Sequence, residues 1–148
     1  MSSITAVIPH IVVGDGRAAI EFYRAAFGAE EIFRMTDPSD GRIGHAELRF
    51  GAGVVMLADE YPDFGAVGPD TLGGSPVTLH LATSDLDTDL GRAAGAGALV
   101  LRGPSEESFG ERKVVLQDPF GHRWVLSQTV ESVAPEEMQR RWEEETGA

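Results

Sequence analysis

The chain has 148 residues, with a hydrophobic content of 42%, a charged content of 24% and a formal net charge of −12. It contains no cysteine, which excludes disulfides, thiolate metal sites and a cysteine nucleophile. The acidity argues against a nucleic-acid partner, because phosphate backbones attract basic surfaces. No apolar run reaches the roughly 20 residues of a membrane helix, and Met1–Thr5 lacks the pattern of a signal peptide. We therefore expect a cytoplasmic protein without a membrane or nucleic-acid partner.

The first half begins with an apolar strand, Val7–Val13, that carries His10. A helix is expected over 17–27, because its apolar residues recur with a period close to 3.6 and Gly28 follows as a terminator. Turns rich in glycine, proline and aspartate then separate three further strands. These strands are expected at about 31–35, 43–50 and 54–58.

The second half repeats this order after a connection over 60–75. An apolar strand at 76–83 carries His80 and leads into a helix at about 85–95. Asp118–Gly121 has the residues of a tight turn and should join the last two strands as a hairpin. The remaining strands are expected at about 98–102, 112–117 and 123–129, and a helix over 135–146 follows them.

The repeat predicts an α+β fold built from two tandem βαβββ modules, whose curved mixed sheets surround a cleft, with an added C-terminal helix. We expect one domain over 1–148, with the first module at about 4–59 and the second at about 76–130. His10 and His80 would then occupy equivalent strands, an arrangement that can build a symmetric pocket.

Gly14–Ala19 matches the G-x-G-x-x-A form of a dinucleotide-binding motif. A Rossmann fold, however, needs a second crossover helix after the next strand, whereas here three strands follow one another. We therefore interpret the glycines as a turn through which the chain leaves the first strand and begins the helix. We expect no dinucleotide cofactor.

Several segments of the sequence, taken together, are similar to those of a known family. They are Pro9–Val13, Ala19–Gly28, His45–Gly51, Val77–Leu81, Phe109–Arg112, Asp118–Trp124 and the tail from Glu131. Together they resemble the vicinal oxygen chelate superfamily, also called the glyoxalase/bleomycin resistance/dioxygenase group, and its demethylubiquinone methyltransferase-like branch. The resemblance covers nearly the whole chain.

The resemblance implies a divalent metal ion held by side chains from four strands, which chelates vicinal oxygens of a substrate. His10 and His80 match two ligand positions of the family. Met56 and Val125 stand where the family has glutamates. Two histidines without a carboxylate suit a hard cation poorly, so the usual four-ligand site is incomplete.

The strand 43–50 offers a substitute carboxylate. His45, Glu47 and Arg49 alternate with apolar residues, so they should face the concave side of their sheet. Glu47 could complete a metal site with His10 and His80. It could also act without a metal as a general base, with His45 or His10 as its partner.

Three functions therefore remain. The preferred one is a protein of the bleomycin-resistance type that binds a small organic molecule in a cleft and needs no cofactor. The second is a divalent-metal-dependent lyase, isomerase or dioxygenase, and the third is a metal-free enzyme with Glu47 as base. The expected ligand-binding residues are His10, Arg49, Met56, His80, Phe109, Arg112, Trp124 and Val125.

Relatives of this kind commonly pair two chains. We expect a homodimer in which each cleft combines the first module of one chain with the second module of the other. The C-terminal helix, with Met138 and Trp142 on one face, would seal an outer surface.

Overall fold

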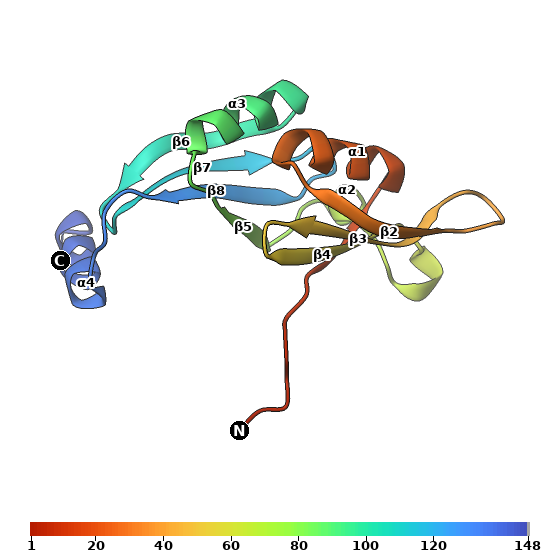
Figure 1. Ribbon diagram of the computed structural model, residues 1–148, viewed down its shortest axis with the longest axis horizontal. Coiled ribbons are helices and arrows are strands. Elements are labelled where there is room, and N and C mark those ends of the chain that lie inside the picture. Colours follow the sequence, from red (N-terminus) through yellow and green to blue (C-terminus); the bar gives the residue numbers. More distant parts are fainter. Residues whose placement is uncertain (148) are drawn as a thin grey trace.

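The computed structural model describes residues 1–147 and has the α+β architecture that the sequence predicts (Figure 1). The first half contains β1 (His10–Val13), α1 (Gly16–Phe27), β2 (Glu30–Thr36), β3 (Ile43–Phe50) and β4 (Gly53–Asp59). The second half contains β5 (Thr78–Ala82), α3 (Leu86–Ala96), β6 (Leu99–Glu107), β7 (Glu111–Gln117) and β8 (Arg123–Thr129). The connection carries the short helices η1 (Pro62–Phe64) and α2 (Pro69–Leu72), and α4 (Pro135–Glu145) follows β8.

Each half forms a four-stranded mixed sheet, in the orders β1-β4-β3-β2 and β5-β8-β7-β6. In both sheets the first strand runs parallel to the last one, and the other neighbours are antiparallel. His10 lies opposite Met56, and His80 lies opposite Val125. The duplicated βαβββ topology is confirmed, and it places the two histidines at equivalent positions of the two sheets.

Two predicted strands have different bounds in the structure. The first strand begins at His10 rather than at residue 7, since residues 1–8 are exposed and extend away from the body (Figure 1). β6 continues to Glu107 instead of ending near residue 102. Gly103 and Pro104 form an irregularity in the register, after which Ser105 pairs with Lys113.

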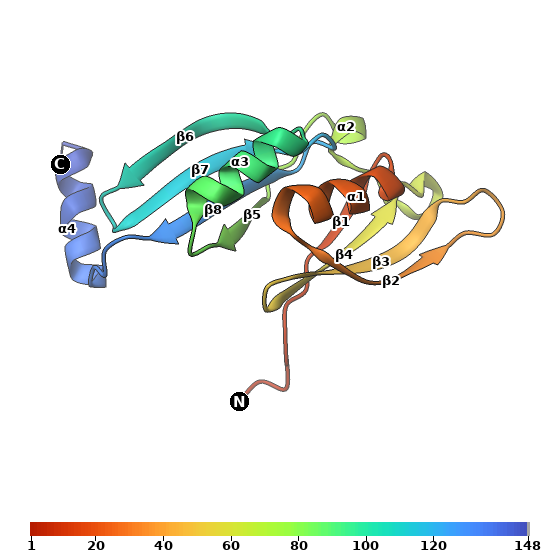
Figure 2. The ribbon, with the colours of Figure 1, turned by 45° about the horizontal axis from the view of Figure 1, so that its top comes forward.

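The helices α1 and α3 lie on the same side of the two sheets and pack against each other (Figures 1 and 2). The core lies between these helices and the sheets. Its largest fully buried side chains are Trp124, Tyr23, Ile20, Ile43, Leu48, Leu57, Leu86 and Leu116. We call the opposite side of each sheet its open face. Apart from Val125, Ser127 and Ala58, the side chains there are half-buried or exposed.

A buried carboxylate joins the two halves. Asp118, in the turn between β7 and β8, accepts a hydrogen bond from the hydroxyl of Tyr23 in α1 and another from Nε1 of Trp124. Its second carboxylate oxygen accepts from the backbone N–H groups of Phe120 and His122. One side chain thus fixes both the hairpin turn and the position of α1 relative to the second sheet.

The start of α1 explains the glycine-rich motif. The backbone N–H of Gly16 donates to the buried carboxylate of Asp59 at 2.6 Å. A Cβ atom at Gly16 would lie 2.8 Å from the side chain of Ile43 and 2.9 Å from Asp59. Gly16 is therefore required for packing, and the N–H group that a phosphate would need is already bonded.

No helix among residues 1–147 has both the length and the apolar character needed to cross a membrane.

Candidate functional site

The open face of the first sheet brings several of the predicted site residues together. His10 in β1 lies opposite Met56 in β4, and Met56 lies opposite Glu47 in β3. Phe33 in β2 continues this row beyond Glu47. Because side chains in register on neighbouring strands share one face, these four residues form one line across the sheet.

His45 and Glu47 form a hydrogen-bonded pair on this face. Nε2 of His45 lies 3.0 Å from Oε2 of Glu47, and the two side chains are only 22% and 25% exposed. The ring of His10 lies 6.1 Å from that of His45, centre to centre, and the ring of Phe33 lies 5.7 Å from it. An imidazole beside a carboxylate, with aromatic groups around it, can exchange a proton with a bound molecule.

Arg49 lies at the margin of the same face. Its guanidinium is 3.5 Å from the carboxylate of Glu30, and both side chains are at least half exposed. An ion pair of this kind contributes little free energy, so Arg49 remains free to turn toward a ligand.

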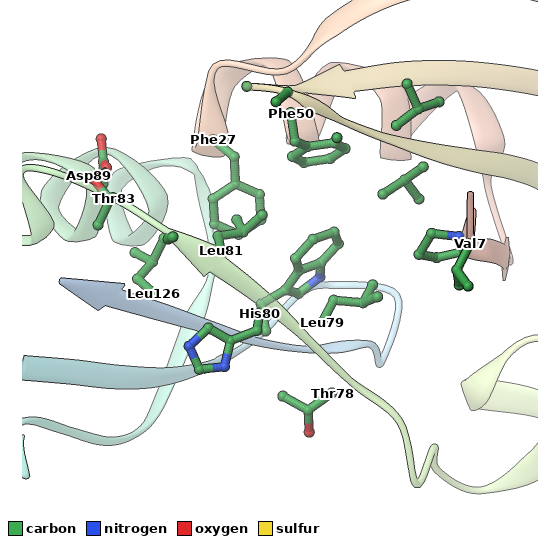
Figure 3. Close-up of a pocket in the computed structure, with 18 residues that line it drawn as sticks. Val7, Phe27, Phe50, Thr78, Leu79, His80, Leu81, Thr83, Asp89 and Leu126 are labelled. Carbon is green, nitrogen blue, oxygen red and sulfur yellow. Dashed lines mark hydrogen bonds between the residues drawn. The ribbon is translucent and has the colours of Figure 1, made fainter. Parts of the chain in front are cut away.

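The open face of the second sheet has a different character. His80 lies in one row with Val125 in β8, Val115 in β7 and Arg102 in β6. In Figure 3, His80 projects from β5 on the side opposite Phe27 and Leu79. The side chain of His80 is therefore available to a ligand on the open face.

A groove of about 560 Å³ separates the two halves. Phe27, Phe50 and Leu81 give it an apolar wall, and β5 crosses it (Figure 3). The volume lies within the range of small-molecule sites, about 300–1,000 Å³. His80 borders this groove as well as the open face.

The donors present do not fit the four-ligand metal site that the resemblance implies. Within residues 1–147, no three His, Asp or Glu side chains are grouped so that they could hold a metal ion. His10 and His80 lie on different sheets of the chain. Their partners in register are the thioether of Met56 and the hydrocarbon of Val125, which do not suit a hard divalent cation.

Two of the expected ligand-binding residues, Trp124 and Arg112, lie on the helix side of the second sheet, and a third, Phe109, lies at its end. Trp124 has no exposed surface and is bonded to Asp118 in the core. Arg112 pairs with Asp87 of α3 at 2.5 Å, on the helix side. Phe109 is half-buried beside the turn between β6 and β7. Trp124 and Val125 were both assigned to the cleft, but neighbours in a strand face opposite sides.

Sequence reasoning overlooked other residues of the open faces, namely Phe33, Arg102, Lys113 and Arg123. The same alternation could have indicated two of them. Lys113 and Arg123 each precede a face residue, Val115 or Val125, by two positions.

A family model described as Glyoxalase/Bleomycin resistance protein/Dioxygenase superfamily matches residues 4–126. An uncharacterised protein of Mycobacterium tuberculosis strain H37Rv is 43% identical over 137 residues, which cover 90% of this chain and 80% of that protein.

Solved structures share the fold. TnmS3, described as an antibiotic binding protein from Streptomyces sp. CB03234, has a TM-score of 0.66 at 23% identity, covering 87% of this chain and 99% of its own. FosX, a fosfomycin resistance protein from Listeria monocytogenes solved with Mn(II) and sulfate, has a TM-score of 0.64 at 14% identity, covering 96% and 99%.

Proposed function

We propose that this chain binds a small organic molecule on the open faces of its two sheets. It belongs to the Glyoxalase/Bleomycin resistance protein/Dioxygenase superfamily. The distribution of ionisable side chains carries the proposal. His10, His45, Glu47 and His80 gather on the faces that α1 and α3 leave uncovered. That a protein with the same fold is described as antibiotic-binding supports a binding role.

Binding is proposed to occur between two chains. Within one chain the halves meet mainly through α1 and α3, and the two sheets lie side by side (Figure 2). The outer strands β2 and β6 expose large apolar side chains, Ile32, Phe33, Met35, Leu99, Val100 and Leu101. Uncovered sheet faces with apolar groups favour association. A twofold homodimer would set the first open face of one chain opposite the second open face of its partner.

The proposed binding does not depend on a metal ion. FosX was solved with Mn(II), but the donor set around His10 and His80 here includes Met56 and Val125 in place of carboxylates. We therefore assign His10 and His80 the role of polar contacts to the ligand. Removal of divalent cations with a chelator is expected to leave ligand affinity unchanged.

A second candidate function rests on the His45–Glu47 hydrogen bond. In this alternative, Glu47 accepts a proton from the bound molecule, which is left with a negative charge. His45 either stabilises that negative charge or takes the proton from Glu47 and returns it to the molecule. The two candidates differ in the fate of the ligand. A binding protein releases it unchanged, whereas an acid–base enzyme converts it to a product.

The proposal is tested by a thermal-shift screen of small organic molecules, repeated with and without Mn²⁺, Ni²⁺ and Zn²⁺. Compounds that raise the melting temperature are then recovered and analysed by mass spectrometry. Unchanged compounds that bind equally well without metal support the proposed function. The second candidate requires a product that disappears in a Glu47→Gln variant.

A further inference from the structure

A hollow of about 470 Å³ on the open face of the second sheet combines an apolar floor with three cations. Val115 in β7 and Val125 in β8 lie opposite each other and form the floor. Arg102 in β6 lies opposite Val115. Lys113 and Arg123 precede Val115 and Val125 by two residues, so strand alternation directs them to the same face.

These cations form no ion pair among residues 1–147, although the chain has 24 acidic and only 12 basic residues. Most of the basic side chains are in ion pairs, namely Arg24, Arg34, Arg42, Arg49, Arg112, Arg140 and Arg141. Arg102, Lys113 and Arg123 form no ion pair with any residue of 1–147. Three unpaired cations around one hollow are therefore a local exception in an acidic protein.

No acidic residue of the described chain, 1–147, lines the hollow itself, although Asp70 borders a neighbouring pocket together with Arg123. The Nζ atom of Lys113 lies 5.5 Å from the ring centre of Phe109. Two acidic residues of the same face, Glu107 and Glu111, lie opposite each other in the strand register at the end of the sheet, beside the β6–β7 turn. Glu111 accepts a hydrogen bond from Ser127 there. Like charges held close together attract an anion from solution.

We propose that the ligand is an organic anion, in which an oxyanion group is attached to an apolar body. Arg102, Lys113 and Arg123 bind the oxyanion, and Val115 and Val125 contact the apolar part. Guanidinium groups bind carboxylate, phosphate and phosphonate oxygens through paired hydrogen bonds, so these three groups share the required chemistry. The inference rests on the proposed function and names the chemical class of its ligand.

The test compares compounds that share one apolar body and differ in charge: naphthoate, naphthylphosphonate and the neutral naphthamide. Binding to the full chain is measured by calorimetry at low and at raised ionic strength. We expect at least one of the two anions to bind about tenfold more tightly than naphthamide, since hydrogen bonds to charged groups are stronger than those between neutral groups. Raised salt should reduce this preference. The stronger of the two anions identifies the oxyanion as carboxylate or phosphonate.

Two variants test whether the preference for anions over naphthamide comes from the arginines of the hollow. Arg102→Gln and Arg123→Gln are each expected to weaken the anion about tenfold and to leave naphthamide within twofold of the wild type. Arg17→Gln, which removes an unpaired exposed arginine from α1, is the matched control and should change neither. Light scattering on each variant separates ligand binding from assembly.

The inference is overturned if naphthamide binds as tightly as both anions, or if Arg102→Gln and Arg123→Gln leave the affinity for the anion unchanged. It is also overturned if these variants dissociate the dimer, because the partner's carboxylates would then be the natural counter-ions. If neutral compounds bind while anions show no preference, only this inference fails. If no compound of any charge binds, the proposed function fails with it.

Discussion

The hydroxyl of Tyr23 in α1 donates a hydrogen bond of 2.5 Å to the carboxylate of Asp118, which lies 95 residues further along the chain in the β7–β8 turn. Both side chains are buried. This bond connects the two repeated halves at the point where their helices meet the sheets. It therefore holds the two open faces in a fixed relative orientation.

Replacing Tyr23 by phenylalanine should destabilise the protein by about 1–3 kcal/mol, because the buried carboxylate of Asp118 loses one of its donors. The fold should be retained, since Trp124 and two backbone N–H groups still bond to Asp118. Urea unfolding followed by Trp fluorescence measures the change. Tyr61→Phe is the comparison, because it removes the hydroxyl bond to Asp37, which lies near the surface rather than in the core. Equal stabilities of the two variants would contradict the structural role of Tyr23.

The Tyr23–Asp118 hydrogen bond also predicts that the protein loses stability at alkaline pH. Burial, and then the charge of Asp118, raises the pKa of Tyr23 well above its ordinary value of about 10. The folded state therefore holds this proton more tightly than the unfolded state. Its contribution to stability is complete below about pH 10 and is lost as pH rises through the folded-state pKa. The free energy of unfolding should fall more steeply above pH 10 in the wild type than in Tyr23→Phe, and parallel curves would refute this.

Two glycines of one motif should respond differently to alanine. A Cβ at Gly16 would overlap Ile43 and Asp59, whereas a Cβ at Gly14 meets no atom within 4 Å. Gly16→Ala should cost about 1–3 kcal/mol, as overpacked buried positions do, while Gly14→Ala should leave the melting temperature almost unchanged. Because the motif serves packing, NADH should not bind to either variant or to the wild type.

Exchange of subunits tests whether the clefts lie between chains. Light scattering should give twice the mass of one chain. Glu47→Gln and His80→Ala chains should each bind ligand weakly, because they alter opposite walls of the proposed cleft. After mixing and reassortment, about a quarter of the wild-type sites should return, since a mixed twofold dimer contains one unaltered cleft. No recovery on mixing would place the cleft within one chain, and a single-chain mass would exclude the dimer.

The strand pattern predicted the fold well because the central strands β3, β4, β7 and β8 each have one covered face. In β3, the alternation of Ala46 and Leu48 with His45 and Glu47 correctly indicated which side chains turn away from α1. The equivalence of His10 and His80 followed from the repeated order of elements. The first inference needed only the period of two residues that every strand has, and the second needed only the repeat.

The position of Trp124 could not be obtained in this way. Its match to the family segment suggested a place at the cleft. Its indole N–H bonds to Asp118, six positions earlier, so the ring lies in the core, where it borders the groove between the two halves. Arg102 on the second open face also escaped notice, because it comes after a register shift in β6. Irregular pairing moves a side chain from one face to the other without any sign in the sequence.

The central claim is that the open faces bind a small organic molecule, and an amide chemical-shift titration of the isotope-labelled protein tests it most directly. Compounds that raise the melting temperature are added stepwise while the amide signals are recorded. The account predicts saturable shifts at Glu47, Met56, Val115 and Val125, with about one molecule bound per chain and the compound recovered unchanged. Shifts confined to α1 and α3, or the absence of any saturable binder, would contradict it.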